Sequence, residues 1–180
     1  MADVAVARGT PDLRETPFVR QLPPAARFIL RGDDSVIAEA ARAMGLVIGE
    51  TPCRASQSGT CAALWLGPDE YLLLAPEAEA RTFSLTLEQA LHAAPHSLVD
   101  VSHRQAGLAI SGPHAADILN SGCPLDLGPA AFPVEMCTRT VFAKAEIILW
   151  RTAPDEFRIE VWRSFADYVA RFLDVAAREF

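Results

Sequence analysis

Short apolar runs and longer apolar stripes alternate along the first hundred residues of the chain. Four runs bounded by Gly, Pro or Asp predict strands, at 28–30, 61–66, 71–75 and 96–101. Apolar residues at helical spacing predict two helices between them, on Val36, Ile37, Ala40, Ala41 and Met44, and on Phe83, Leu87, Ala90 and Leu91. Asp34 or Ser35 is the expected cap of the first helix, and residues 49–60 are expected to form a loop.

The second part of the chain shows the same alternation. Apolar runs predict strands at 108–110, 141–143, 146–151 and 157–162. A helix is expected on Ala115, Ile118 and Leu119, and a last helix begins at Ser164, with Asp167 completing a capping box. The last helix has an apolar stripe of Phe165, Tyr168, Val169, Phe172 and Leu173. Residues 1–24 are polar and end in two prolines, which predicts an irregular N-terminal tail before a single domain at 25–180.

Two pairs of motifs recur in the same order. "ILRGDD" at 29–34 matches "AISGPH" at 109–114, and "LWLGPDEYLL" at 64–73 matches "LWRTAPDEFRI" at 149–159. We therefore predict an α+β fold of two ferredoxin-like halves, each a split β-α-β unit, related by internal duplication at about 25–103 and 104–180. Neither half alone buries enough surface, so the two sheets are expected to pack through shared apolar faces.

One stretch, "CPLDLGPAAFPVEMCTRT" at residues 123–140, interrupts this regular pattern, and we call it the proline segment. Its three prolines each fix φ near about −65°, so the chain is stiff there and loses little entropy on docking. An apolar, stiff loop is a candidate contact surface. The candidate subunit-interface residues are Pro124, Leu127, Phe132, Met136 and Arg139. For Arg139 the alternatives are a structural arginine that holds this segment, or, less favoured, a ligand-binding one.

Composition excludes several classes of partner. The formal net charge of −7 opposes binding to nucleic acid and to anionic membranes. No apolar run approaches the roughly 20 residues needed to span a bilayer, and the N-terminus has no apolar core of a secretory signal.

The four cysteines, at 53, 61, 123 and 137, form no C-x-x-C pair. We read them as reduced thiols of a cytoplasmic protein.

Candidate chemistry is sparse. The chain has no G-x-G-x-x-G motif, no phosphate-loop lysine and no histidines at metal-ligand spacing. Asp100 or Ser102 with His103 is either an acid–base group at a strand end or a surface turn. Cys123 and Cys137 are either nucleophiles or structural thiols, and the charged strand faces near 156–163 are expected to be solvated. The sequence therefore predicts no catalytic, cofactor-binding or metal site on this chain.

Several long motifs resemble a known family. "LVDVSHRQAGLAISGP", "CPLDLGPAAFPVEMCTRTVFAKAEIILWR", "WLGPDEYLLL" and "DEFRIEVWRSFADYV" are similar to the gamma subunit of heterotetrameric sarcosine oxidase, from about residue 25 to the end. The resemblance implies a fold like the folate-binding domain of aminomethyltransferases. It also implies a complex that oxidises sarcosine to glycine and passes the one-carbon unit to tetrahydrofolate.

The same resemblance implies where the chemistry resides. FAD, FMN, NAD and tetrahydrofolate are expected on partner subunits, with no cofactor on this chain. The expected partners are the alpha, beta and delta subunits, and the alpha subunit is the favoured contact. Two alternatives stay open: a free-standing folate-binding protein of the aminomethyltransferase kind, with Asp100 as its carboxylate, and a regulatory binding domain.

Overall fold

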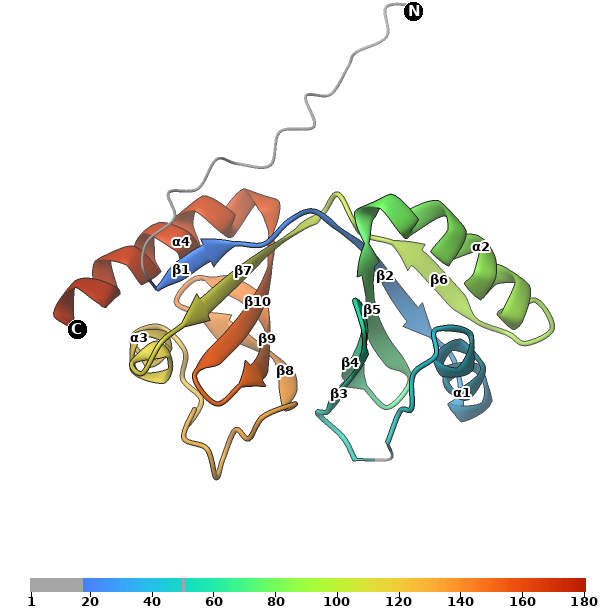
Figure 1. The fold of residues 1–180 in the computed structure, drawn as a ribbon, viewed down its shortest axis with the longest axis horizontal. Coiled ribbons are helices and arrows are strands. Elements are labelled where there is room, and N and C mark those ends of the chain that lie inside the picture. The colour runs from blue at the N-terminus through green and yellow to red at the C-terminus, as the bar shows by residue number, and fades with distance from the viewer. Residues whose placement is uncertain (1–17, 50) are drawn as a thin grey trace, which may run out of the picture.

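The computed structural model describes residues 18–49 and 51–180 as two antiparallel sheets with helices on their outer sides (Figure 1). Its strands are β1 (Val19–Gln21), β2 (Ala25–Arg31), β3 (Ala55–Ser58), β4 (Cys61–Gly67), β5 (Glu70–Pro76), β6 (Ser97–Asp100), β7 (Gln105–Ser111), β8 (Cys137–Phe142), β9 (Ala145–Ala153) and β10 (Glu156–Trp162). Its α-helices are α1 (Asp34–Ala43), α2 (Ala80–Leu91), α3 (Ala115–Asn120) and α4 (Arg163–Ala176), and single 3₁₀ turns are η1 (Glu77–Glu79) and η2 (Ala177–Glu179). The α+β class predicted from the alternating pattern is confirmed.

Both sheets have five strands, and their orders correspond position by position. One sheet runs β3-β4-β5-β2-β6 and the other runs β8-β9-β10-β7-β1. Strand β2 pairs with β5 from Ala25↔Pro76 to Arg31↔Glu70. Strand β7 pairs with β10 in the same way, from Gln105↔Trp162 to Ser111↔Glu156. Residue 27 of β2 thus corresponds to residue 107 of β7, and residue 74 of β5 to residue 160 of β10.

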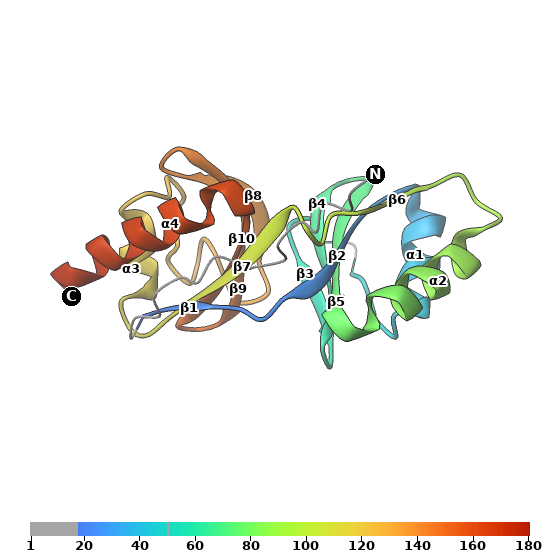
Figure 2. The same ribbon diagram turned by 90° about the horizontal axis from the view of Figure 1, so that it is seen from above.

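The N-terminal strand is the main departure from the sequence-based prediction. Residues 19–21 form β1, which pairs antiparallel with β7, so this part of the stretch expected to be an irregular tail belongs to the second sheet. In the first sheet the corresponding edge position is filled by β6. Two connections, β1 to β2 and β6 to β7, therefore cross between the sheets side by side (Figure 2). Residues 1–17 of the predicted tail lie outside the described residues.

Three apolar clusters account for the layering. One packs α1 and α2 on the outer face of the first sheet, and another packs α3 and α4 on the outer face of the second. The third lies between the inner faces of the sheets and includes Leu64, Leu72, Ile148 and Trp150. Each sheet is therefore covered on both faces over much of its area, which agrees with the expectation that the sheets share apolar faces.

Local predictions at helix and loop ends need correction. The cap of α1 is Asp33 rather than Asp34 or Ser35, and its carboxylate accepts from the Val36 amide at 3.0 Å. Helix α4 follows β10 directly, with Trp162 at its N-cap position and no side-chain cap, so the capping box on Ser164 is wrong. The predicted loop 49–60 contains β3, which extends the sheet through pairing with β4.

Candidate functional site between the two sheets

The side chains of the proline segment divide between the core and the surface. Leu127 and Phe132 are 0% and 1% exposed and pack in the core beneath α3 and α4. The expectation that they form an exposed apolar surface is wrong, because the turns around the prolines direct these two side chains inward. Pro124 is exposed, Val134 is 39% exposed, and Met136 is partly buried.

A buried arginine of β9 holds the proline segment in place. Nη1 of Arg151 donates to the carbonyl oxygens of Leu127, at 3.2 Å, and Phe132, at 2.8 Å. Its guanidinium group lies 5.0 Å from the centre of the Phe157 ring, and its Nε donates to the carbonyl of Pro154 at 3.1 Å. The structural role considered for Arg139 in holding this segment is therefore filled by Arg151.

The end of the proline segment pairs with the loop that occupies the corresponding place in the first half. The Ala55 amide donates to the Glu135 carbonyl at 2.8 Å, and the Cys137 amide donates to the Cys53 carbonyl at 2.9 Å. Both Cys53 and Glu135 adopt positive φ, at 57° and 70°. The two loops thus exchange equivalent hydrogen bonds where the halves meet.

Arg139 has a partner within this chain. Both of its terminal nitrogens contact the carboxylate of Glu70 at the start of β5, with Nη1 at 3.3 Å from Oε2. The Glu70 carboxylate also lies 3.8 Å from Nη2 of Arg31. Arg139 therefore connects the second sheet to the first, with its own side chain half exposed.

A buried cluster of charges joins the sheets near their centre. Glu160, 1% exposed on β10, accepts from Nε of Arg27 at 2.6 Å and from Nε of Arg158 at 2.8 Å. Although burial alone would raise the pKa of Glu160, the guanidinium groups of Arg158 and Arg27 hold that pKa below its ordinary value. The carboxylate therefore stays ionised, and two cations surround one anion.

Room for this cluster comes from a glycine. A Cβ atom at Gly107 would lie 3.1 Å from Nη2 of Arg27 and 3.2 Å from Oε1 of Glu160. Contacts that short require the neighbouring groups to move, and a hydrogen-bonded buried pair has little freedom to do so. Gly107 thus allows Arg27 of β2 to reach across to β10.

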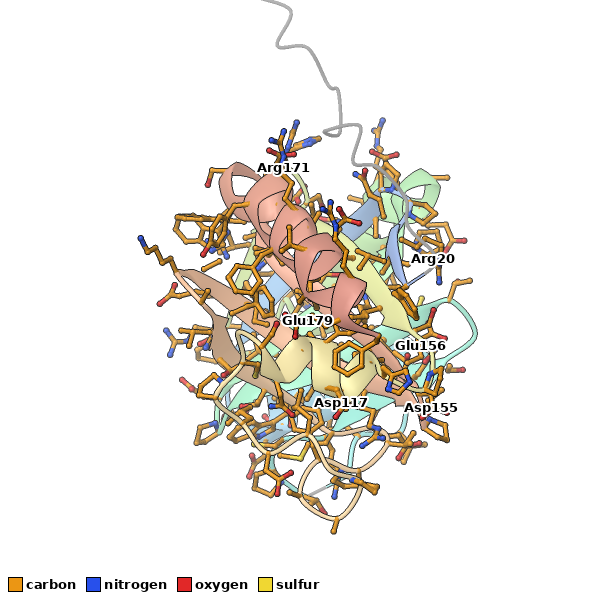
Figure 3. All side chains as sticks on the ribbon, turned by 90° about the vertical axis from the view of Figure 1, so that its left-hand side faces the viewer. Arg20, Asp117, Asp155, Glu156, Arg171 and Glu179 are labelled. Atoms are coloured by element: carbon orange, nitrogen blue, oxygen red, sulfur yellow. The ribbon has the colours of Figure 1, made fainter. Side chains whose placement is uncertain are left out.

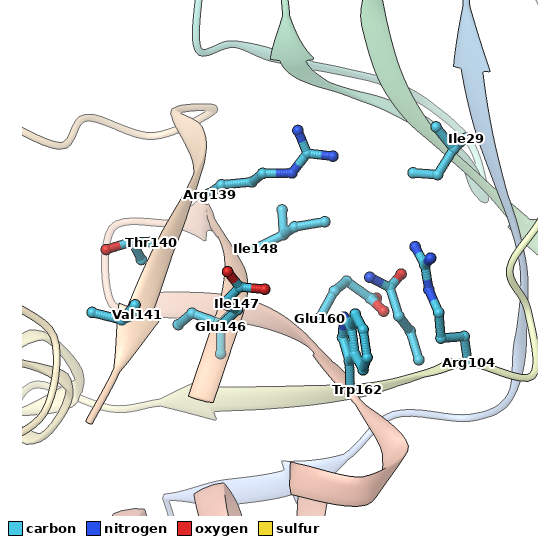
Figure 4. Close-up of a pocket in the computed structure, with 11 residues that line it drawn as sticks. Ile29, Arg104, Arg139, Thr140, Val141, Glu146, Ile147, Ile148, Glu160 and Trp162 are labelled. Carbon is cyan, nitrogen blue, oxygen red and sulfur yellow. The ribbon is translucent and has the colours of Figure 1, made fainter. Parts of the chain in front are cut away.

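Beside the cluster lies a pocket of about 490 Å³, which we call the inter-sheet pocket. It is lined by Ile29, Arg104, Gln105, Arg139, Thr140, Val141, Glu146, Ile147, Ile148, Glu160 and Trp162 (Figure 4). Ile29 belongs to the first sheet, and the other residues come from the second sheet and the turn before β7. The Arg104 guanidinium lies 5.5 Å from the centre of the Trp162 ring, a cation–π arrangement.

The strand-end residues that the sequence singled out form a turn outside this pocket. The Asp100 carboxylate accepts from the Ser102 amide at 2.8 Å, and the Ser102 hydroxyl accepts from the Arg27 amide at 2.9 Å. His103 is exposed and contributes to a separate, smaller pocket of about 70 Å³. The surface-turn alternative thus fits these residues. The carboxylates that line the inter-sheet pocket are those of Glu146 and Glu160, and Asp100 is not part of its wall.

The two cysteines considered as nucleophiles are buried. Burial raises the pKa of the Cys137 thiol to about 12, and its sulfur lies 3.5 Å from the Trp65 carbonyl oxygen. The thiol is therefore protonated at neutral pH and inert as a nucleophile. Cys123 is 3% exposed within the core of the second half.

The described residues, 18–49 and 51–180, offer neither a metal-binding cluster nor a membrane-spanning helix. These residues contain no cluster of three or more His, Cys, Asp or Glu side chains placed to hold a metal ion. None of their helices has the length and apolar character that crossing a membrane requires.

Sequence reasoning missed the charged cluster. The alternation in β10 placed Phe157, Ile159 and Val161 correctly on one face, but Arg158 and Glu160 were expected in solvent. The useful signal was Arg27, a charged residue inside the apolar run of β2. A charge in such a place requires a buried partner of opposite sign.

Two sheets that meet through their inner faces, with helices outside, give this chain a fold similar to that of an aminomethyltransferase. Aminomethyltransferase T of the glycine cleavage system from Bartonella henselae superposes with a TM-score of 0.65 at 16% identity, over 86% of this chain and 44% of that one.

Within that class, residues 31–179 match the Sarcosine oxidase, gamma subunit family. The sarcosine oxidase subunit gamma of Corynebacterium sp. (strain U-96) is 36% identical, over 99% of this chain and 84% of that protein. A chain of the heterotetrameric sarcosine oxidase from Corynebacterium sp. U-96, in complex with pyrrole 2-carboxylate, superposes with a TM-score of 0.83 at 32% identity, over 90% of this chain and 84% of that one. This chain belongs to the sarcosine oxidase gamma subunit family.

Proposed function

We propose that this chain assembles with alpha, beta and delta subunits into a heterotetrameric sarcosine oxidase and takes no direct part in the chemistry. The observation that carries the proposal is the likeness over nearly the whole chain to a gamma subunit, at 36% identity. The assembled enzyme would oxidise sarcosine to glycine and pass the one-carbon unit to tetrahydrofolate. FAD, FMN, NAD and tetrahydrofolate would be held by the partner subunits, and the complex would work in the cytoplasm.

The two halves are proposed to be ferredoxin-like units related by internal duplication. Their strand orders correspond, and the same turn contact occurs in both. The Gly32 amide donates to the Asp69 carbonyl at 3.1 Å, and the Gly112 amide donates to the Asp155 carbonyl at 2.9 Å. The exchanged hydrogen bonds at residues 53–55 and 135–137 support a pseudo-twofold axis between the halves.

The outer side of the proline segment is proposed to contact the alpha subunit. Pro124 and Val134 are exposed there, while Arg151, Leu127 and Phe132 fix the same segment from inside. A loop that is already ordered loses little entropy on docking. Met136 and the half-exposed Arg139 lie at the end of this surface. The exposed part of Arg139 can contact a partner subunit while its guanidinium stays paired with Glu70.

Co-expression tests the assembly role. A tagged copy of this chain, produced with the alpha, beta and delta subunits, should purify with all three. Omitting it should prevent the stable heterotetramer from forming. The isolated chain should show neither sarcosine oxidation nor flavin absorbance after gel filtration. Flavin that stays with the isolated chain, or a complete active complex formed without it, contradicts the proposal.

A matched pair of variants tests the surface. Val134→Asp places a charge on the proline segment, and Val47→Asp places the same charge at a 90% exposed position elsewhere. Val134→Asp should reduce co-purification of the alpha subunit, and Val47→Asp should not. Both isolated variants should melt like the wild type, because each side chain is exposed. Equal co-purification in the two variants refutes the assignment of this surface.

A further inference from the structure

Two polar side chains that line the inter-sheet pocket lack an ion-pair or hydrogen-bond partner among the described residues. Arg104 takes part in no ion pair with another described residue and rests only on the Trp162 ring. Gln105 is 7% exposed, and its Oε1 has no hydrogen-bond partner within the described residues. A buried polar group without a partner is costly, and such groups are usually completed by water or a ligand.

The other charged groups of the pocket each have a partner of opposite charge, with one exception. Arg139 contacts Glu70, and Glu160 lies between two arginines. Glu146, like Arg104, forms no ion pair with another described residue. The charges left to select a ligand are therefore one cation, Arg104, and one anion, Glu146.

These two charges flank an aromatic surface. The strand order β7-β10-β9 places Trp162 of β10 between the turn that carries Arg104 and the strand that carries Glu146. Neighbouring strands lie about 4.8 Å apart, so both long side chains can converge on a small molecule above the indole. Figure 4 shows Arg104 and Glu146 on either side of Trp162.

Size and polarity narrow the ligand further. The volume of about 490 Å³ lies within the roughly 300–1,000 Å³ typical of small-molecule pockets. The aliphatic part of the wall consists of Ile29, Val141, Ile147 and Ile148. A molecule with one carboxylate, one ammonium group and a short apolar side chain matches this lining.

We propose that the inter-sheet pocket binds a zwitterionic α-amino acid with an apolar side chain. The ligand carboxylate pairs with Arg104, and its ammonium group pairs with Glu146 and donates to Oε1 of Gln105. An ammonium group has three donors, so it can serve both oxygens. The apolar side chain lies against Ile29 and Ile148.

Isothermal titration calorimetry of the full-length chain tests the ligand class. L-leucine should bind saturably at one site. 4-Methylpentanoate lacks the ammonium group, and 3-methylbutylamine lacks the carboxylate, so each should bind at least about tenfold more weakly. Inorganic phosphate should not compete with leucine. An absence of saturable leucine binding overturns the proposal, and so does equal affinity for either analogue.

Variants locate the site. Arg104→Met and Glu146→Gln should each weaken leucine binding about tenfold or more, because each removes a charge-assisted contact. Arg171→Met removes the same charge from the outward side of α4 and should leave binding unchanged (Figure 3). Arg104 and Glu146 are both exposed, so melting temperatures should stay near that of the wild type. Wild-type affinity in both pocket variants overturns the assignment.

Discussion

Replacing Glu160 by glutamine should be the most damaging single change at the contact between the two sheets. The substitution keeps the size of the side chain and removes the anion that pairs with both Arg27 and Arg158. Arg27 is 2% exposed, so its charge would remain buried without a partner of opposite sign. Breaking a buried pair from one side costs about 3–5 kcal/mol, which for a chain of this length lowers the melting temperature by about 6–20 °C.

Substitutions of the three cluster residues should lower the free energy of unfolding by different amounts. Arg27→Met leaves Glu160 paired with Arg158, so it should cost less, roughly 2–3 kcal/mol. Arg158→Met leaves the buried Arg27–Glu160 pair intact, and its side chain is already 21% exposed, so about 1–2 kcal/mol is expected. The surface pair of Arg171 with Asp167 is a control, and Arg171→Met should cost less than about 0.5 kcal/mol.

Urea unfolding of the isolated chain, followed by circular dichroism, measures these free energies directly. The slope with urea should be the same in all variants if only the native contact is changed. A double variant, Arg27→Met with Glu160→Gln, should lose less than the sum of the two single losses, because the groups interact. If Arg158→Met costs as much as Glu160→Gln, or if the double variant is additive, the account of the cluster is wrong.

Four further outcomes are expected. Because the pKa of Glu160 is lowered on folding, its contribution to stability is present above its ordinary pKa and is lost as pH falls; the advantage of wild type over Glu160→Gln should shrink below about pH 4.5 in urea titrations. Gly107→Ala should cost about 1–3 kcal/mol in the same assay through its contacts with Arg27 and Glu160, whereas alanine at the open position 49 should not. Arg151→Met should lower stability by roughly 2–4 kcal/mol and allow limited proteolysis between 123 and 136, because two carbonyls lose their donor. In a thiol-reagent assay the two partly exposed cysteines should react in the native chain, and Cys137 only after unfolding; rapid native labelling of Cys137 contradicts its burial.

The parts of the fold that the sequence predicted correctly depend on local pattern. The turns at 67–70 and 153–156 lie between apolar runs, and each gave a correct hairpin, β4–β5 and β9–β10. The strand β1 was missed because three residues carry little pattern, and its pairing with β7 is made across about ninety residues of sequence. Such long-range pairing depends on the packed sheet rather than on local propensity.

The buried charged cluster was not predicted for a related reason. Period-two alternation separates the two faces of a strand, but it does not say what covers the second face. In β10 the first face meets α4 and the second meets the other sheet, so Glu160 is removed from water and Arg158 is largely covered. The same limit applies to Leu127 and Phe132, whose inward direction is set by turns that no periodicity reports.

The buried cluster also explains why the two halves differ at their centre. Position 27 of β2 corresponds to position 107 of β7, and position 74 of β5 corresponds to position 160 of β10. The first half carries Arg27 and Leu74 at these places, and the second carries Gly107 and Glu160. Arginine at both 27 and 107 would bring two guanidinium groups together. There is no room for the second one, because even a Cβ atom at position 107 would crowd Arg27 and Glu160.

A strictly symmetric chain therefore could not build this contact. Each half supplies one member of the ion pair, and the equivalent positions hold the glycine that makes room and the leucine that packs between the sheets. Because an unpaired charge in either half would be buried at high cost, each half needs the other in order to fold stably. We infer that this difference between the two proposed repeats couples the folding of the two halves. The Glu160 and Gly107 variants test that coupling from the ion pair and from the glycine that makes room for it.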